Sequence, residues 1–142
     1  MRSAWLRLLS GLAATAALCG CGGYDVTPPA AVARTALERS LMTWKDGGSP
    51  GPIAGAEPPV QAIDSEWQNG RKLASFEILG EEGGAGDRRF TVRLVGRDPA
   101  GEKEARYVVL GQGPVLVYRE EDYRKMLDMD NNPAPPKTKR GR

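Results

Sequence analysis

The period of the hydrophobic pattern changes near the middle of the chain, and this change restricts the possible fold more than any other feature. Between residues 30 and 44, apolar side chains recur every three or four positions, which predicts an amphipathic helix. Beyond residue 72, apolar and polar side chains alternate, which predicts strands of a sheet with one covered face. The 142 residues leave room for one domain. We therefore expect an α+β fold in which an N-terminal amphipathic helix packs on a curved antiparallel meander.

The predicted helix has signals at both ends. Thr27 suits the N-cap and Pro28 the first helical position, where its missing N–H costs nothing. Gly47 and Gly48 favour a left-handed C-terminal cap, followed by a Gly/Pro-rich loop over residues 49–59. Packing on a core is favoured over lying on a membrane, because the polar side of the helix is mixed in sign. The apolar stripe consists of Ala30, Ala33, Leu37, Leu41 and Trp44.

About four strands are predicted in the second half of the chain. They cover residues 73–79, 89–95, 104–110 and 115–118. Their connections are rich in Gly, Pro and Asp and are too short for crossover helices, so consecutive strands should pair as antiparallel hairpins.

Two further segments are assigned less regular structure. Residues 64–71, which contain Trp67, are predicted to form a turn or a single helical turn before the first confident strand. Residues 120–129 are predicted to form a terminal helical turn, because their acidic start suits a helix N-terminus. Met126 and Leu127 are expected to cap an open end of the core.

The N-terminus has the features of an export signal. Arg2 and Arg7 supply positive charge, and residues 8–18 form an uncharged, Leu/Ala-rich run. A membrane-spanning helix needs about 20 apolar residues, so this shorter run fits a cleavable signal peptide. The sequence Leu18-Cys19-Gly20-Cys21 resembles the bacterial lipobox, which implies cleavage before Cys21 and acylation of its sulfur and its new amino group. The alternative is an ordinary secretory signal with a chance cysteine near its end.

Histidine is absent and the chain has two cysteines, which narrows the possible chemistry. Without imidazole, Ser-His and Cys-His nucleophiles and His-ligated zinc are excluded. If Cys19 leaves with the signal and Cys21 carries lipid, no thiol remains for a disulfide or a metal site. The mature fold should then depend on its packed core alone, and no cofactor or metal is expected.

Motifs and composition divide the chain into four predicted parts. Residues 1–20 are the signal peptide, 21–29 a lipidated tether, 30–130 the α+β domain and 131–142 a disordered, basic, Pro-rich tail. Acidic and basic residues are interspersed through the domain, so it lacks the basic stripe of a nucleic-acid reader. The tail can touch anionic lipid or cell-wall polymer, and a solvated terminus with no partner is the alternative.

One helix followed by a curved meander resembles the cystatin-like architecture, which cystatins share with the larger NTF2-like domains. The resemblance covers roughly residues 28–125 and contains no diagnostic motif, so it implies a fold and no activity. The Gln-x-Val-x-Gly hairpin of cystatin inhibitors is absent, which argues against protease inhibition. The second half, from residues 64–70 to residues 117–119, also resembles a pattern in small uncharacterised bacterial lipoproteins.

The groups that an NTF2-like enzyme could use as a base or an acid are the catalytic candidates of this chain. They are Asp64, Glu77, Tyr107 and Tyr118, and their spacing singles out none of them. The acids at residues 128 and 130 match the first and third positions of a calcium loop, but Pro133 stands where the turn glycine is needed, so a calcium loop is not predicted. We therefore expect no enzymatic activity.

Trp67, Tyr118 and Arg119 are the predicted partner-binding residues. A large aromatic side chain in a polar stretch can anchor a partner, although Trp67 plugging an open end of the sheet is the favoured alternative. Tyr118 and Arg119 lie at a predicted strand end, where they could form a rim contact or only an edge.

The predicted function is that of a lipid-anchored, extracytoplasmic binding or assembly module of the bacterial envelope. Its partners would be the membrane, through the anchor, and an envelope protein or polymer. The periplasmic side of the outer membrane is favoured, because Gly22 is not the Asp that marks inner-membrane retention in some bacteria. The alternative is a small-molecule-binding or catalytic NTF2-like domain, which predicts a concavity with converging polar side chains instead of an apolar surface patch.

Overall fold

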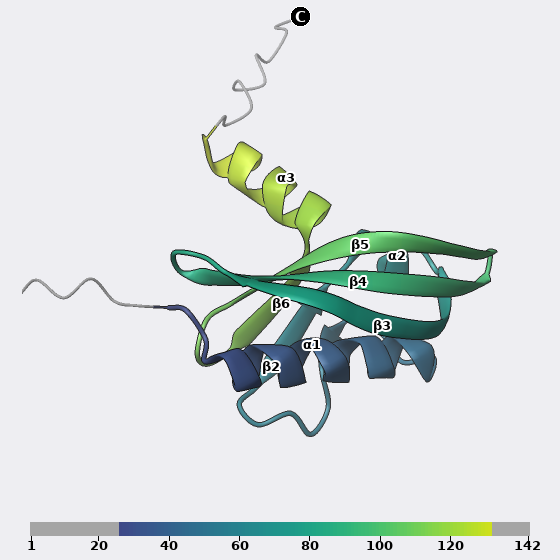
Figure 1. Cartoon of the computed structure of the whole chain (residues 1–142), viewed down its shortest axis with the longest axis horizontal. Helices are drawn as coiled ribbons and strands as arrows, with labels where there is room; N and C mark the ends of the chain where they lie inside the picture. Colours follow the sequence, from purple (N-terminus) through teal and green to yellow (C-terminus); the bar gives the residue numbers. More distant parts are fainter. Residues whose placement is uncertain (1–25, 132–142) are drawn as a thin grey trace, which may run out of the picture.

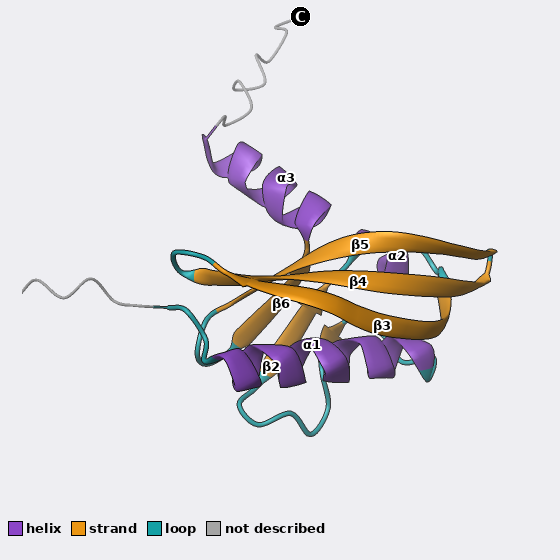
Figure 2. Ribbon diagram, viewed as in Figure 1, coloured by secondary structure: helices purple, strands orange, loops and turns teal. Residues whose placement is uncertain are grey.

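In the computed structural model, which describes residues 26–131, a mixed sheet of six strands lies between a long helix and a shorter one (Figures 1 and 2). The α+β class is confirmed, but the described sheet has six strands where about four were predicted. The predicted signal peptide, Cys21 and most of the tail lie outside the described residues. The helices are α1 (Ala30–Lys45), α2 (Ser65–Gln68) and α3 (Glu120–Asn131), and the strands are β1 (Gly51–Pro52), β2 (Val60–Ile63), β3 (Lys72–Gly83), β4 (Asp87–Asp98), β5 (Ala100–Leu110) and β6 (Val115–Arg119).

The four predicted strands correspond to β3, β4, β5 and β6, which pair in chain order as an antiparallel meander. The hairpin of β3 and β4 is longer than expected, because residues 80–83 continue β3 where a loose loop was predicted. A shift of register between Ile78 and Gly80 lets the Gly-rich stretch stay paired with β4. The glycines of residues 80–83 therefore make the strand β3 irregular but do not end it.

The two remaining strands were missed, and they make the sheet mixed. β2 runs parallel to β6, with Val60 opposite Val115, and β1 pairs antiparallel with β2. Residues 49–59 were predicted as a loop, but Gly51 and Pro52 form β1 within it. β2 has four residues, of which Val60 and Ala62 are buried, and a strand this short gives only a weak alternating signal.

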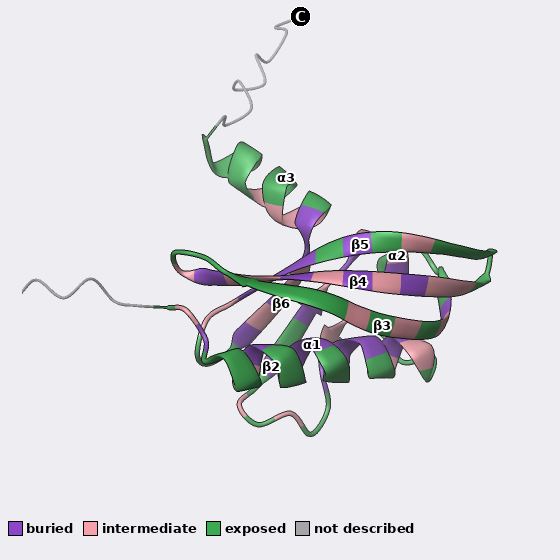
Figure 3. Ribbon diagram, viewed as in Figure 1, coloured by how far each residue is buried: buried purple, intermediate pink, exposed green. Residues whose placement is uncertain are grey.

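α1 covers one face of the sheet and supplies much of the core. Its buried side chains include Leu37, Leu41 and Trp44, which face the sheet while the opposite side of the helix is exposed (Figure 3). At its end, Gly47 has a φ of 84°, and the N–H groups of Gly47 and Gly48 donate to carbonyl oxygens of the last helical turn. This is the left-handed cap that the two glycines predicted.

The start of α1 differs from the expectation at Thr27 and Pro28. The N-cap is Pro29, and no side chain caps the helix there. The reason is local, because a residue that precedes a proline is disfavoured in the helical region and Pro28 is followed by Pro29. The helix therefore begins at Ala30, once both prolines have been passed.

α3 leaves the end of β6 and lies on the side of the sheet opposite α1 (Figure 1). Within it only Glu120 is buried, whereas Leu127 is 38% exposed and Met126 is half-buried. The prediction that Met126 and Leu127 cap an open end of the core is therefore wrong. Three acidic residues in the first turn favour the helix electrostatically even without a buried apolar stripe.

Candidate functional site

Asp64 organises the structure around α2 from a buried position. It is 2% exposed, and its Oδ1 accepts hydrogen bonds from the backbone N–H groups of Glu66 at 2.9 Å and Trp67 at 3.2 Å. These are N-terminal N–H groups of a short helix, which have no partner within the helix itself. Asp64 is thus the N-cap that starts the single helical turn predicted over residues 64–71.

The second carboxylate oxygen of Asp64 joins the cap to the sheet. The hydroxyl of Tyr107, on β5, donates to Oδ2 at 2.6 Å, and Nη1 of Arg119, at the end of β6, lies 3.5 Å from the same oxygen. Burial raises the pKa of Tyr107 well above its ordinary value, and the neighbouring Asp64 carboxylate raises it further. Two of the catalytic candidates, Asp64 and Tyr107, therefore meet, but the phenol stays protonated and the carboxylate is fully engaged.

Arg119 connects this buried pair to the surface. Its side chain is 5% exposed and lies within ion-pair distance of Asp64, Glu66 at 3.5 Å and Glu121 at 3.2 Å. Burial opposes its charge, but Tyr107 and the surrounding carboxylates raise its pKa on balance. Nη1 forms no hydrogen bond among the described residues, so Asp64 holds it by charge alone. Arg119 was predicted to be a rim contact and instead lies inside the molecule.

Glu66 lies where this network reaches the solvent. Its carboxylate accepts hydrogen bonds from Lys103 of β5 and forms a longer ion pair, at 3.8 Å, with Arg71. Burial alone would raise its pKa, but Lys103, Arg119 and Arg71 together bring the pKa below the ordinary value of 4.5. A carboxylate held in this way is a poor proton acceptor near neutral pH.

Trp67 is a core residue. It is 7% exposed, its indole N–H donates to the carbonyl oxygen of Gly48 at 2.8 Å, and its ring stacks on Trp44 with centroids 5.7 Å apart. This agrees with the plug that was the favoured alternative and leaves little of the ring for a partner. The third predicted contact, Tyr118, is half-buried against Tyr123 on α3, with ring centroids 5.6 Å apart, so the three residues do not share a surface.

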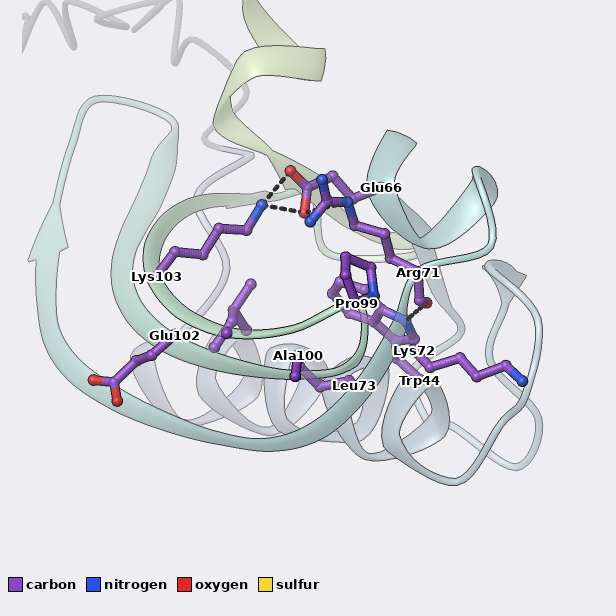
Figure 4. Close-up of a pocket in the computed structure, with 12 residues that line it drawn as sticks. Trp44, Glu66, Arg71, Lys72, Leu73, Pro99, Ala100, Glu102 and Lys103 are labelled. Atoms are coloured by element: carbon purple, nitrogen blue, oxygen red, sulfur yellow. Dashed lines mark hydrogen bonds and ion pairs between the residues drawn. The ribbon is translucent and has the colours of Figure 1, made fainter.

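A cavity of about 200 Å³ opens at the end of the sheet where β4 turns into β5, and we call it the end pocket (Figure 4). Apolar side chains of Trp44, Leu73 and Leu94 form part of its wall. Glu66 and Lys103 converge on the same space from α2 and β5, and their hydrogen bonds cross its upper side in the view of Figure 4.

A second hollow of about 310 Å³ adjoins the end pocket, and the residues that line both are Trp44, Arg71, Lys72 and Leu73. Sequence reasoning missed it, because its cations come from separate elements. We call it the basic hollow, and the cations that line it are Lys45 at the end of α1, Arg71 before β3, Lys72 on β3 and Arg97 on β4.

The outer face of the meander is occupied by ion pairs. Arg93 on β4 pairs with Glu77 of β3 at 2.8 Å and with Glu102 of β5 at 2.9 Å. Glu77, another of the catalytic candidates, is therefore a surface partner of an arginine. The large apolar side chains that are exposed among the described residues are scattered, and they are Val26, Met42, Leu79, Leu127 and Met129.

Comparisons with protein-family models, curated proteins and solved structures found no match. Within residues 26–131, no group of three or more acidic or cysteine side chains is placed to hold a metal ion. No helix of this part of the chain is long and apolar enough to cross a membrane. The arrangement at the end of the sheet can bind a ligand by apolar contact and by charge.

Proposed function

We propose that the mature chain is a lipid-anchored, extracytoplasmic, non-catalytic binding module of the bacterial envelope, and that its ligand occupies the hollowed end of the sheet. The observation that carries the binding role is the end pocket, where Glu66 and Lys103 reach from different elements into a space walled by apolar side chains. Such a combination fixes the orientation of a ligand while burying its apolar surface.

The described chain begins at the end of the domain opposite the end pocket. α1 begins beside the N-terminal side of the described chain and runs to Trp44 and Lys45 at the pocket end, a span of about 24 Å for its 16 residues (Figure 1). Val26, five residues after Cys21, lies near Gly86 in the turn between β3 and β4, far from the turn between β4 and β5. An anchor at Cys21 would therefore leave the pocket facing away from the membrane.

A binding role is supported over catalysis by the state of the acidic groups. Asp64 accepts three hydrogen bonds, and the pKa of Glu66 is lowered, so neither is a free base at neutral pH. The absence of histidine from the sequence removes the usual alternative. Assembly through an apolar patch has less support than ligand binding, since the exposed large apolar side chains are scattered.

A small apolar-polar molecule is the second candidate ligand, in place of an envelope protein or polymer. It is favoured by the form of the end pocket, a concave space of about 200 Å³ with apolar walls and a few polar groups, which is the kind of site that small ligands occupy.

The lipid anchor is tested by fatty-acid labelling in a bacterium that exports the chain. Labelled fatty acid should enter the wild-type protein and the Cys19→Ser control but not Cys21→Ser, because only Cys21 is expected to be acylated. Label retained by Cys21→Ser would contradict the proposal.

The binding role is tested by placing a photo-crosslinking amino acid at Ala100, which lines the end pocket, or at Ala85 in the turn between β3 and β4. Both positions are exposed alanines, so each substitution disturbs the fold equally little. Illumination of living cells should give a discrete adduct from position 100 and none from position 85. Equal adducts from both positions, or none from position 100, would count against a ligand at this end.

A further inference from the structure

We propose that the basic hollow binds a phosphate-bearing anion. This proposal deepens the proposed function by naming a ligand class. It rests on that function only for the extracytoplasmic location in which the ligand would be bound.

The inference starts from the distribution of ion pairs. Residues 26–131 contain 14 Lys and Arg side chains, and ten of them lie within 4.0 Å of a carboxylate oxygen. The four that form no ion pair in this part of the chain are Arg39, Lys45, Lys72 and Arg97, and all except Arg39 line the basic hollow. The fourth cation of the hollow, Arg71, has the longest of the ion pairs, 3.8 Å to Glu66. Most cations of this part of the chain are therefore paired with carboxylates, whereas unpaired cations gather around the basic hollow.

No Asp or Glu lines the basic hollow. Asp46 and Asp98 are neighbours in sequence of Lys45 and Arg97, yet neither forms an ion pair with any described residue. Like charges around one hollow repel each other, and the repulsion is relieved when an anion enters. Three of the four cations of the hollow thus have no ion pair with a described residue, and a ligand would neutralise them.

Phosphate fits this set of cations better than a single carboxylate does. Arg71 and Arg97 offer planar forks that bind two oxygens of a phosphate at once, and Lys45 and Lys72 add compact charges. Ser49 and Gln68 also line the hollow and supply neutral hydrogen-bond donors.

Two tryptophan side chains form part of the wall of the basic hollow. Trp44 and Trp67 line it, are 4% and 7% exposed and are stacked on each other, so a packed aromatic surface lies beside the cations. Charge interactions across such a surface are screened less than those in open solvent. Both indole N–H groups donate to backbone carbonyl oxygens, that of Trp44 to Arg71 and that of Trp67 to Gly48, which fixes the position of the rings.

The phosphate could come from a soluble polymer or from a lipid headgroup. The basic hollow lies at the C-terminal end of α1, about 24 Å along the helix from the first described residues, so an anchor at Cys21 would hold the hollow away from its own bilayer. This geometry points to the polymer as the source.

The test is a titration of the mature protein in neutral detergent with sodium polyphosphate, followed by tryptophan fluorescence and by equilibrium dialysis. The chain has three Trp, and Trp5 leaves with the signal, so the remaining fluorescence comes from Trp44 and Trp67 in this hollow. Polyglutamate of similar length serves as the carboxylate control. We expect saturable binding of polyphosphate that weakens with added salt, and binding of polyglutamate that is about tenfold weaker.

Two double variants separate the basic hollow from the other cations. K72Q/R97Q removes two exposed cations of the hollow, and R124Q/K125Q removes the same charge from α3, where both side chains are about two thirds exposed. We expect K72Q/R97Q to weaken polyphosphate binding about tenfold and R124Q/K125Q to change it less than twofold. The basic tail is common to both proteins and therefore cancels. Equal losses in the two variants, or no binding by the wild type, would overturn the proposal.

The source of the phosphate is distinguished with protein anchored in phosphatidylcholine vesicles, with and without phosphatidylglycerol. A tryptophan signal produced by phosphatidylglycerol alone, and lost in K72Q/R97Q, assigns the site to lipid headgroups. A signal produced only by added polyphosphate assigns it to a polymer. Either result supports a phosphate site, whereas in vivo crosslinking at position 100 tests the binding function separately.

Discussion

At the scale of single residues, Asp64 joins local and distant structure. One carboxylate oxygen starts α2, and the other holds Tyr107 of β5 and the charge of Arg119 at the end of β6. Sequence reasoning placed Asp64 and Tyr107 in a set of four candidates, but it could not show that these two meet, because 43 positions separate them. What brings them together is the pairing of strands, which no local pattern encodes.

Asp64→Asn should destabilise the fold by about 3 kcal/mol, because it removes the charge of the buried carboxylate that pairs with the buried Arg119 side chain. Asparagine is also a good N-cap, so the substitution isolates the loss of charge from the loss of the cap. Urea unfolding at pH 7 measures the change. The control Asp46→Asn, at an exposed carboxylate without an ion pair, should stay within about 0.5 kcal/mol of the wild type. A similar small change for Asp64→Asn would show that the network adds little stability.

Glu66 should make stability depend on pH in the acidic range. Its pKa in the folded protein lies below the ordinary value of 4.5, so the carboxylate form stabilises the fold above that pH. This contribution is lost as the pH falls through the folded pKa. The difference in unfolding free energy between the wild type and Glu66→Gln should therefore be largest near neutral pH and shrink below about pH 4.5.

Urea unfolding between about pH 3 and pH 7 provides the measurement for both proteins. Glu77→Gln is the matched control, because Glu77 pairs with Arg93 on the outer face with 63% of its side chain exposed, where solvent screens the pair. A gap for Glu66→Gln that stays constant with pH would contradict the assigned role of the carboxylate.

At the scale of elements, α1 holds the sheet through a narrow stripe. Leu37 is fully buried and Leu41 and Trp44 nearly so, whereas Met42, on the same helix, is 46% exposed. The contrast between the two sides of one helix allows packing to be measured separately from helix propensity.

Leu37→Ala should reduce the free energy of unfolding by about 2 to 5 kcal/mol, because it leaves a cavity between α1 and the sheet. Val92→Ala, at a fully buried position on β4, should cost somewhat less, since fewer atoms are removed. Met42→Ala should change stability by no more than about 0.5 kcal/mol. Thermal melting of the three variants gives the comparison, and an unchanged midpoint for Leu37→Ala would remove α1 from the core.

The elements that sequence predicted well are those with a long periodic signal. The four strands of the meander and the end of α1 at Gly47 have enough residues, or a specific enough cap, to be visible locally. β2 could not be predicted because an alternation over four residues is too short to be distinctive, and because its partner β6 lies far along the chain. The basic hollow was missed for the same reason, since Lys45 and Arg97 become neighbours only through the fold.

At the scale of the whole molecule, the domain has two distinct ends. The N-terminal side of the described chain lies by two turns: Val26 is near Gly86 between β3 and β4, and its carbonyl oxygen accepts a hydrogen bond at 2.9 Å from the N–H of Gly111, between β5 and β6. The end pocket and the basic hollow lie at the other end. If Cys21 is acylated, this polarity becomes an orientation relative to the membrane.

A fluorophore near the anchor should therefore be quenched by the bilayer more than one near the pocket. Ala85→Cys and Ala100→Cys each add a single reactive thiol, since Cys21 would be blocked by lipid and Cys19 removed with the signal. The labelled proteins are anchored in vesicles that carry a quencher on the lipid headgroups. Stronger quenching at position 85 is expected, and stronger quenching at position 100 would reverse the proposed orientation.

The parallel pairing of β2 with β6 also fixes when the sheet can be completed. Val60 has Val115 as its neighbour, so nearly the whole meander must be synthesised before β2 gains a strand on that side. Until then Val60 and Ala62, both buried in the finished fold, are exposed on a strand with an open edge. Until the meander is complete, a factor that shields nascent chains would therefore have an open strand edge to cover on this protein.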